Sequence, residues 1–412
     1  MRKQYLAENL PPMLTGKELE SALTVLPEYD ANIQNQPSSI RLMALSDLYD
    51  LYLPSCMSTE IYSKLYLSLI RSLQKKQTQA AVRQQNENYR AIRQQPYAGI
   101  IGGSDSFTII GTSGIGKSTA ISRSISLISG NKIIEVQEPF LKIVPCLVVQ
   151  CPFDCSVKGL LLDILRKVDE HLDTRHYDNA LRARATTDML IGCVSQVALN
   201  HIGLLIVDEI QNVVGAKHGK SLVAVLTQLI NNSGISICMV GTPESARFFE
   251  QAMQLARRSL GIQYGKLEYD AYFADFCKVL FRYQYVKNPA TLTDGIIHWL
   301  YEHSSGIISN VVSLVHDAQE IAILSGKEAL DLETLNEAYH NRLSLLHGFI
   351  EPSITATPKA TTAKAATAIK LQESMTVDHP NLISELAALA RQNQTDIVAM
   401  LKEHMTIVEV AL

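Results

Sequence analysis

The sequence predicts an α/β fold with a parallel sheet flanked by helices, followed by a small all-helical domain, or lid. Two observations predict it: short apolar segments alternate with segments of helical periodicity between about residues 96 and 286, and the pattern is helical throughout from residue 292 to residue 347. A chain of 412 residues, 47% hydrophobic and 19% charged, is long enough for two or three domains. We therefore expect an N-terminal arm with a basic helical segment (1–95), an α/β core (96–288), a helical lid (289–350), and a flexible tether with a C-terminal helix (351–412).

A phosphate-binding loop is the feature around which the core is organised. The apolar segment 107–110 breaks at Gly111 into GTSGIGKST, which matches G-x-x-x-x-G-K-[ST] at every position. Its glycines allow successive backbone N–H groups to converge on a phosphate at the positive end of the next helix, expected at 117–129. Lys117 is expected to bridge the β- and γ-phosphates, and the Ser118 hydroxyl to bind Mg²⁺. A glycine-rich turn without chemical function is the alternative. The expected ATP-binding residues are Gly111, Thr112, Ser113, Gly114, Ile115, Gly116, Lys117, Ser118, Thr119 and Asp208.

The segment LLIVDEIQ carries the second half of this site. Its apolar residues predict a strand at 203–207, so that Asp208 and Glu209 emerge at the carboxyl end of a central strand, where open α/β sheets bind ligands. We expect Asp208 to hold Mg²⁺ through water and Glu209 to polarise the water that attacks the γ-phosphate. The Asp-Glu pair alone is a weak signal, but here it follows a complete phosphate loop by about 90 residues.

Two further segments are expected to complete the catalytic set. Thr242 follows the apolar segment 235–240, a strand expected between the other two, and would sense the γ-phosphate; capping of the helix that begins near Pro243 is the alternative. Arg257 and Arg258 in LARRSLG suit a finger that reaches the γ-phosphate bound by a neighbouring subunit. A surface pair bound to a nearby acid is the alternative for these arginines.

The N-terminal part is expected to be an accessory region. Residues 1–60 have scattered prolines among short apolar segments, which indicates a partly helical arm that contacts a neighbour. A helical stretch then carries six basic residues against one acid between Arg71 and Arg93, a net charge of +5. This basic strip is either a solvated helix face or a surface that contacts the DNA backbone.

Composition excludes some classes of function. The net charge of −4 argues against a protein that binds nucleic acid over its whole surface, so any DNA contact must come from local patches. Seven cysteines without a C-x-x-C pair indicate reduced, buried thiols. No apolar run reaches the roughly 18 residues that a membrane span needs, so we expect a cytoplasmic protein without membrane contact.

The C-terminal segment is expected to bind a partner. Residues 353–369 contain almost no large apolar side chain and are typical of a flexible tether. Beyond them, apolar residues recur at helical spacings within 370–412, which has three basic and six acidic residues. An amphipathic helix on a tether favours a groove on a partner, and folding back on its own lid is equally open.

These motifs, in this order, resemble one family. GTSGIGKST, LLIVDEIQ, MVGTPE and LARRSLG, within residues 40–350, are similar to TnsC, the AAA+ ATPase that regulates transposition in Tn-seven-like bacterial transposons, and to its relative TniB. The resemblance implies an AAA+ P-loop NTPase core with a helical lid, and ATP-driven assembly of rings or helical filaments on duplex DNA without strong sequence specificity. In the family the assembly links a target-selection protein of the TniQ or TnsD type to transposase subunits, and ATP hydrolysis takes it apart.

The resemblance also assigns roles to residues. It implies ATP and Mg²⁺ as ligands, Ser118 and Asp208 at the metal, and contact of the tail beyond residue 350 with the transposase. The catalytic residues that it implies are Glu209, Thr242, Arg257 and Arg258. The DNA-binding residues are Lys158, which falls where the pore residues of the family begin, and by extension Arg182 and Arg184.

The chain departs from the AAA+ pattern at one point. Many AAA+ proteins place an arginine near the start of the third lid helix, but the segment 307–310 reads IISN. This departure puts more weight on Arg257 and Arg258 as the groups that reach the γ-phosphate.

Two other functions stay open. A replication initiator or helicase-loader ATPase would share the core, but such proteins carry a DNA-reading domain after the lid, for which about 60 residues leave no room. A nucleotide-switched scaffold with negligible turnover is less consistent with an intact Glu209.

Overall fold

The computed structural model describes residues 6–102, 106–130, 132–137, 140–214, 219–246, 261–343 and 346. The chain divides into two compact units, residues 1–352 and residues 353–412. The predicted tether and C-terminal helix (351–412) lie outside the described residues, so the fold below is that of the first unit.

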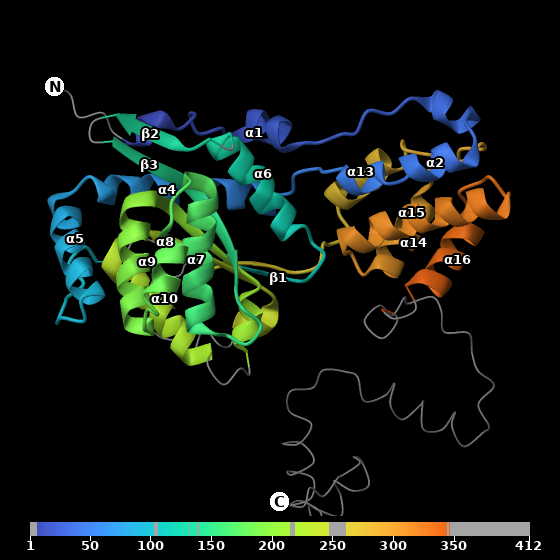
Figure 1. Ribbon diagram of the computed structural model, residues 1–412. Helices are drawn as coiled ribbons and strands as arrows, with labels where there is room; N and C mark the ends of the chain where they lie inside the picture. The colour runs from blue at the N-terminus through green and yellow to red at the C-terminus, as the bar shows by residue number, and fades with distance from the viewer. Residues whose placement is uncertain are drawn as a thin grey trace, which may run out of the picture. The chain divides into compact units, whose positions relative to one another are not determined.

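A six-stranded sheet with the strand order β2-β3-β4-β5-β1-β6 forms the centre of this unit (Figure 1). Neighbouring strands are parallel except β2 and β3, which form an antiparallel pair at one edge. β5 lies between β1 and β4, the position predicted for the strand that leads to Thr242. The strands are β1 (Phe107–Gly111), β2 (Ile134–Gln137), β3 (Phe140–Gln150), β4 (Ile202–Asp208), β5 (Ser236–Gly241) and β6 (Ile262–Tyr264).

The predicted α/β class is confirmed, but the sheet is mixed rather than wholly parallel. β2 has four residues, and β3 begins at Phe140 after a short connection. A four-residue strand is too short for its alternation to be distinguished from a loop, so the sequence does not predict this hairpin. β1 and β4 match the prediction closely, because a strand covered on both faces is a continuous apolar run.

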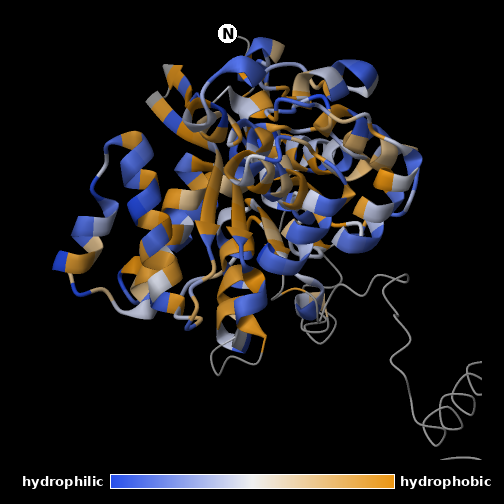
Figure 2. Cartoon of the chain, turned by 90° about the vertical axis from the view of Figure 1, so that its right-hand side faces the viewer, coloured by the Kyte–Doolittle hydropathy of each residue, from blue (hydrophilic) through white to orange (hydrophobic). Residues whose placement is uncertain are grey.

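Helices cover both faces of the sheet (Figure 1). The apolar side chains of α7, α8, α9 and α10 form one buried cluster with β3, β4 and β5. Those of α4, α6 and the start of the chain form a second cluster on the opposite face. Figure 2 shows the apolar strands enclosed by helices with polar outer surfaces. The helices are α4 (Cys56–Lys76), α5 (Gln79–Ile92), α6 (Lys117–Ser129), α7 (Val157–Leu172), α8 (His176–Arg182), α9 (Thr187–His201) and α10 (Gly219–Ser233), with the short 3-10 helices η3 (Ile210–Val213) and η4 (Pro243–Ser245).

Four helices form a separate hydrophobic cluster, the lid. They are α13 (Ala271–Leu280), α14 (Asp294–Ser304), α15 (Ile308–Ser325) and α16 (Leu332–Arg342). α13 precedes the expected lid boundary at residue 289, yet its Phe273 and Phe276 are buried in this cluster. Among the described residues no single helix is long and apolar enough to cross a membrane, and α14 with α15 passes that test only as a pair bent by 117°.

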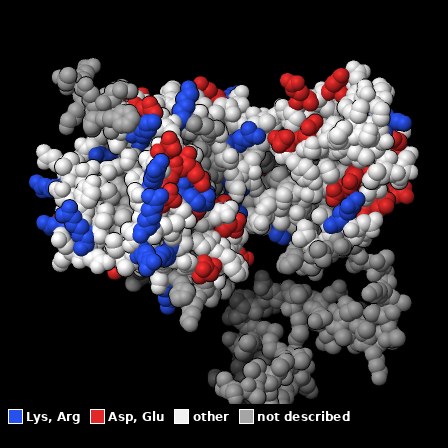
Figure 3. All heavy atoms as spheres, viewed as in Figure 1, with Lys and Arg blue, Asp and Glu red and all other residues white. Residues whose placement is uncertain are grey.

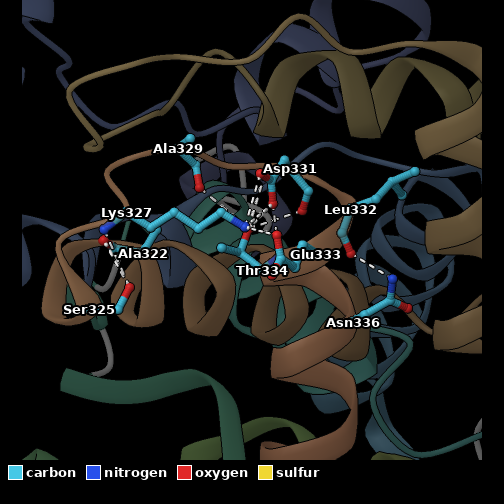
Figure 4. A network of polar contacts seen from close by, with 9 residues as sticks. All are labelled: Ala322, Ser325, Lys327, Ala329, Asp331, Leu332, Glu333, Thr334 and Asn336. Carbon is cyan, nitrogen blue, oxygen red and sulfur yellow. Dashed lines mark hydrogen bonds and ion pairs between the residues drawn. The ribbon is translucent and has the colours of Figure 1, made fainter.

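The turn between α15 and α16 is held by polar contacts (Figure 4). Asp331 and Thr334 form a capping box, in which the Thr334 N–H donates to Asp331 Oδ1 at 2.9 Å. The Lys327 ammonium group reaches Asp331 Oδ2 at 3.1 Å and Glu333 Oε2 at 2.5 Å. Because such exposed ion pairs are screened by solvent and contribute little to stability, the cap is the main local stabilisation of this turn.

The N-terminal arm packs against its own chain, whereas the sequence predicts contact with a neighbour. Leu19 and Leu23 are buried in the cluster on the α4 and α6 face of the sheet. Leu45, Leu48 and Leu51 are buried in the lid cluster. These five leucines of the arm are therefore buried within the chain itself, whereas Met43 and Tyr49 of the arm are exposed. The arm contains η1 (Leu6–Asn9), α1 (Gly16–Leu23), η2 (Ala31–Asn35), α2 (Ser38–Ala44) and α3 (Asp47–Asp50).

A buried ion pair fixes the arm on the lid. The Arg41 side chain is 1% exposed, and its two terminal nitrogens donate to the two carboxylate oxygens of Glu328, each at 2.6 Å. The same guanidinium group donates to the backbone oxygens of Gln36 and Tyr285 at 3.0 and 2.9 Å. The hydrogen bond from Arg41 lowers the pKa of Glu328. Because these hydrogen bonds can form in only one position of the arm, Arg41 fixes where the arm lies on the lid.

Candidate nucleotide-binding site

The phosphate loop lies between β1 and α6, as predicted. Gly114 and Gly116 adopt left-handed conformations with φ of 81° and 93°, which side chains rarely adopt. Gly116 is the N-cap of α6, so Lys117 and Ser118 begin the helix, and the free N–H groups of its first turn face the loop. The local geometry is that of an anion-binding loop.

Lys117 currently binds its own loop. Its amine donates to the backbone oxygens of Gly111 at 2.6 Å and Thr112 at 2.9 Å. Partial burial lowers the pKa of Lys117, and the nearby carboxylates of Asp208 and Glu209 oppose that shift. The amine therefore lies where backbone oxygens and two carboxylates surround it, a position suited to phosphate oxygens.

The carboxyl end of β4 brings the predicted acids to the loop. The Ser118 hydroxyl donates to Asp208 Oδ2 at 3.4 Å, which joins two residues 90 positions apart. The Glu209 N–H donates to Asp208 Oδ1 at 2.8 Å, and Glu209 has a φ of 57°. This left-handed turn ends the strand and directs the two carboxylates differently.

Thr242 follows β5 and lies beside the same loop. It occupies the N-cap position of η4, but its side chain makes no capping hydrogen bond there. A hydrogen bond from Thr242 instead lowers the pKa of the exposed Glu244 carboxyl. The hydroxyl is thus oriented by an acid that the sequence reasoning does not single out.

One cavity of about 270 Å³ joins these segments. It is bordered by residues from the phosphate loop, the ends of β4 and β5, η3 and the start of α15. The predicted residues from three separate segments of the sequence therefore meet in one place. Its lining residues are Ser113, Gly114, Gly116, Lys117, Ser118, Thr119, Asp208, Glu209, Gln211, Gly241, Thr242 and Ser309.

The lid reaches the phosphate loop through its third helix. The Ser309 N–H donates to the Gly114 oxygen at 3.1 Å, and a side chain at Gly114 would collide with the Ser309 hydroxyl. The lining residues of the cavity from the described part of the lid include this serine and no arginine, in line with the departure noted in the sequence. The two predicted finger residues, Arg257 and Arg258, lie outside the described residues.

A second cavity of about 200 Å³ adjoins the first, since both are bordered by Gly114, Gly116, Thr119 and Ser309. Its walls come from the arm, α13 and α15 and carry apolar and aromatic side chains. The sequence reasoning does not identify it, because its residues read as ordinary core positions. They include Tyr49, Leu51, Tyr52, Leu53, Met57, Tyr272, Phe276, Ile308 and Val312.

Residues 78–263 match the family model described as bacterial TniB protein. This segment, which is less than half of the chain, belongs to the TniB family. The matched segment contains the phosphate loop, Asp208, Glu209 and Thr242, and it ends before the lid. The resemblance seen in the sequence is confirmed. With the phosphate loop and the acids at the end of β4, this membership identifies a P-loop ATPase that binds nucleotide.

Solved structures resemble the chain at low similarity. The Aeropyrum pernix ORC1 protein in complex with DNA is 14% identical, with 79% of this chain and 81% of that chain covered and a TM-score of 0.41. Drosophila ORC bound to DNA is 12% identical, with 98% and 86% covered and a TM-score of 0.42. Domain III of the Thermotoga maritima replication initiation protein DnaA is 15% identical, with 67% and 94% covered and a TM-score of 0.33. No curated protein matches the sequence. The function is therefore argued from the family and the site.

The three residues predicted to bind DNA are all exposed. Lys158 lies in the first turn of α7, whereas Arg182 ends α8, which is anchored by Asp169 near the other end of α7. Arg184 follows with a φ of 48°. Figure 3 shows basic side chains interspersed with acidic ones on the face it displays, so that face carries no continuous basic surface.

The predicted basic strip is not one exposed surface. The Lys76 amine donates to the backbone oxygens of Ala198 and Leu199 at 2.6 and 2.7 Å, at the C-terminal end of α9. Burial lowers the pKa of Lys76 to about 7. Arg90 pairs with Glu87 at 2.8 Å. At Lys76 the strip therefore has a structural role, because a cation satisfies the last carbonyls of a helix.

Proposed function

We propose that this chain is an ATP-dependent regulator of DNA transposition in the bacterial cytoplasm. In this proposal it assembles with ATP as a ring or filament on duplex DNA, links a target-selection protein to transposase subunits, and leaves the DNA after hydrolysis. The single observation that carries the proposal is the cavity in which Lys117, Ser118, Asp208, Glu209 and Thr242 meet within a TniB-family segment.

ATP fits the two adjoining cavities in one orientation. The triphosphate would occupy the polar cavity, where Lys117 exchanges its two backbone acceptors for phosphate oxygens and the loop N–H groups bind the β-phosphate. The base would occupy the apolar cavity among the arm, α13 and α15. The base contact supplies binding energy, whereas the chemistry is confined to the polar end.

The donor atoms at the polar end fit Mg²⁺. Ser118 Oγ and Asp208 Oδ2 are hard oxygen donors within 3.4 Å of each other, and Mg²⁺ in nucleotide sites takes few protein ligands because phosphate oxygens and waters complete its shell. When bound, the ion would neutralise charge on the phosphates. Glu209 would accept the proton of the attacking water, and Thr242 would hydrogen-bond to the γ-phosphate or that water.

Assembly is proposed to supply the remaining charge. The described lid residues at the cavity provide no arginine, so Arg257 or Arg258 of a neighbouring subunit would complete the site in trans. Lys158, Arg182 and Arg184 would contact DNA phosphates, which gives binding without strong sequence preference. The segment 351–412 would contact the transposase.

The test is electron microscopy of the full chain with duplex DNA and a non-hydrolysable ATP analogue. We expect rings or filaments on DNA for the wild type and none for the double variant Arg257→Ala/Arg258→Ala. The matched control is Arg282→Ala/Lys287→Ala, which removes two exposed cations of the lid segment and should still assemble.

Two further outcomes decide between parts of the proposal. Assemblies that persist in the double variant would show that Arg257 and Arg258 are not needed in trans for assembly. Wild-type protein that stays monomeric with DNA and every nucleotide at low salt would overturn the assembly role and favour a helicase or another protein as the partner.

A further inference from the structure

Gln211 is in direct contact with the residue proposed to act as general base. It lies in η3, two residues after Glu209, and borders the polar cavity together with Asp208 and Glu209. Its side-chain amide nitrogen, Nε2, donates a hydrogen bond to Glu209 Oε2. An ionised carboxylate only accepts hydrogen bonds, so the amide group must present its nitrogen to Glu209 and turn its oxygen elsewhere.

The oxygen of this amide has no partner. Gln211 Oε1 is buried and accepts no hydrogen bond from any residue that the structure describes. The Ser245 hydroxyl, which also lies beside Gly241, donates instead to the Thr242 oxygen at 2.6 Å. A buried acceptor without a partner destabilises the folded state, so its retention beside the cavity needs a reason.

The end of β5 is shaped around this amide. A Cβ atom at Gly241 would lie 3.1 Å from Gln211 Oε1 and 2.7 Å from the Ile210 side chain. Ile210 is fully buried and anchors η3. Glycine at position 241 therefore leaves room for Gln211 between the acid at the end of β4 and Thr242 after β5.

We propose that Gln211 is a positioning residue for ATP hydrolysis. Its amide nitrogen holds one oxygen of the Glu209 carboxylate, which leaves the other oxygen to take the proton of the attacking water. The amide keeps this orientation, with its carbonyl oxygen buried and without a partner, because the opposite orientation would set that oxygen against the Glu209 carboxylate. The carboxylate held in this way aligns the water between Glu209 and Thr242. The water oxygen forms a bond to the γ-phosphorus, the bond from that phosphorus to the β–γ bridging oxygen breaks, and ADP and inorganic phosphate leave.

This inference rests on the proposed ATPase function, since a water must attack the γ-phosphate for Gln211 to align it. The contact predicts a specific kinetic signature. Loss of alignment should slow the chemical step and leave ground-state binding intact, because Gln211 contacts the base rather than the phosphates.

The experiment is single-turnover ATP hydrolysis with excess full-length protein, Mg²⁺ and duplex DNA, together with a binding measurement for a fluorescent ATP analogue. We expect Gln211→Met to lower the hydrolysis rate by about 10- to 100-fold, less than the 10²- to 10⁴-fold contribution typical of a general base. Binding should stay within about twofold of the wild type, as expected for an interaction made only in the transition state. Gln211→Asn, which keeps the amide but shortens the side chain, should also be slow.

The controls separate the inference from the proposed function. Gln263→Met changes an exposed glutamine of β6 and should hydrolyse ATP at the wild-type rate. Glu209→Gln should bind ATP without hydrolysis. If the wild type hydrolyses no ATP, the proposed function fails and the inference with it. If the wild type and Glu209→Gln behave as expected but Gln211→Met matches Gln263→Met, accelerates hydrolysis, or loses binding and rate equally, only the role of Gln211 is overturned.

Discussion

The two ends of the candidate site are built in different ways. The polar end takes Ser113 to Thr119 from one continuous loop and adds the ends of two neighbouring strands. The apolar end takes its walls from the arm, α13 and α15, which are separated by more than two hundred residues of sequence. The polar end is thus a local structure on the sheet, whereas the apolar end exists only when arm and lid are both in place.

The largest effect is expected at the polar end. Lys117→Ala removes the only lysine that borders this cavity among the described residues, and it should weaken binding of both ATP and inorganic tripolyphosphate by more than about 100-fold, since charge-assisted phosphate contacts are the strong ones. Competition with a fluorescent ATP analogue measures both ligands. Lys266→Ala, at an exposed position that borders neither of the two cavities, is the control. Unchanged tripolyphosphate binding in Lys117→Ala would show that the polar end does not bind phosphate.

A smaller and more selective effect is expected at the apolar end. Val312→Trp adds a large side chain to a cavity of about 200 Å³ and should weaken ATP binding by about 10-fold through steric exclusion of the base. Tripolyphosphate binding should be unchanged, because that ligand has no base. The same competition assay measures the difference between the ligands. Equal losses for ATP and tripolyphosphate would show that the two cavities do not divide the nucleotide as proposed.

The smallest effect is expected from acid. The pKa of Glu328 is lowered in the folded state, chiefly by Arg41, so its stabilising contribution is complete above its ordinary pKa of 4.5 and is lost as the pH falls through the lower folded value. Thermal unfolding between pH 6 and pH 3 should therefore show a steeper loss for the wild type than for Glu328→Gln. The reference pair is Asp275 with Lys278, which is exposed; Asp275→Asn should follow the wild-type curve. Identical unfolding curves for Glu328→Gln and the wild type would show that the pair of Arg41 and Glu328 does not stabilise the arm on the lid.

The sequence predicts the polar end well for a physical reason. Phosphate binding requires glycines, a lysine and a hydroxyl at fixed spacing, and the acids must follow an apolar strand. Residues that are neighbours in the sequence therefore identify this end of the site. Helix α6 at Lys117–Ser129 agrees with the predicted range. The position of β5 between β1 and β4 follows the prediction as well.

The sequence predicts the apolar end poorly because its residues carry no distinctive chemistry. Tyr272 and Phe276 have the spacing of any buried helix face, and the arm residues come before the core in sequence. The sequence also does not identify Gln211, because its proposed role depends on the left-handed turn at Glu209 and on the space left by Gly241. At Lys76 the sequence suggests a surface role that the structure does not show. This lysine of the basic strip is partly buried and donates to backbone oxygens at the end of α9.

The path of the arm gives the lid a second attachment to the core. Val25 and Tyr52 exchange backbone hydrogen bonds of 2.8 and 2.9 Å, and the residues between them pass over the lid, where Arg41 is buried. Tyr52 also borders the apolar cavity. With the base bound in this cavity, as proposed, nucleotide and arm would share one equilibrium. A partner that draws the arm off the lid must weaken nucleotide binding, and bound nucleotide must weaken that partner by the same factor.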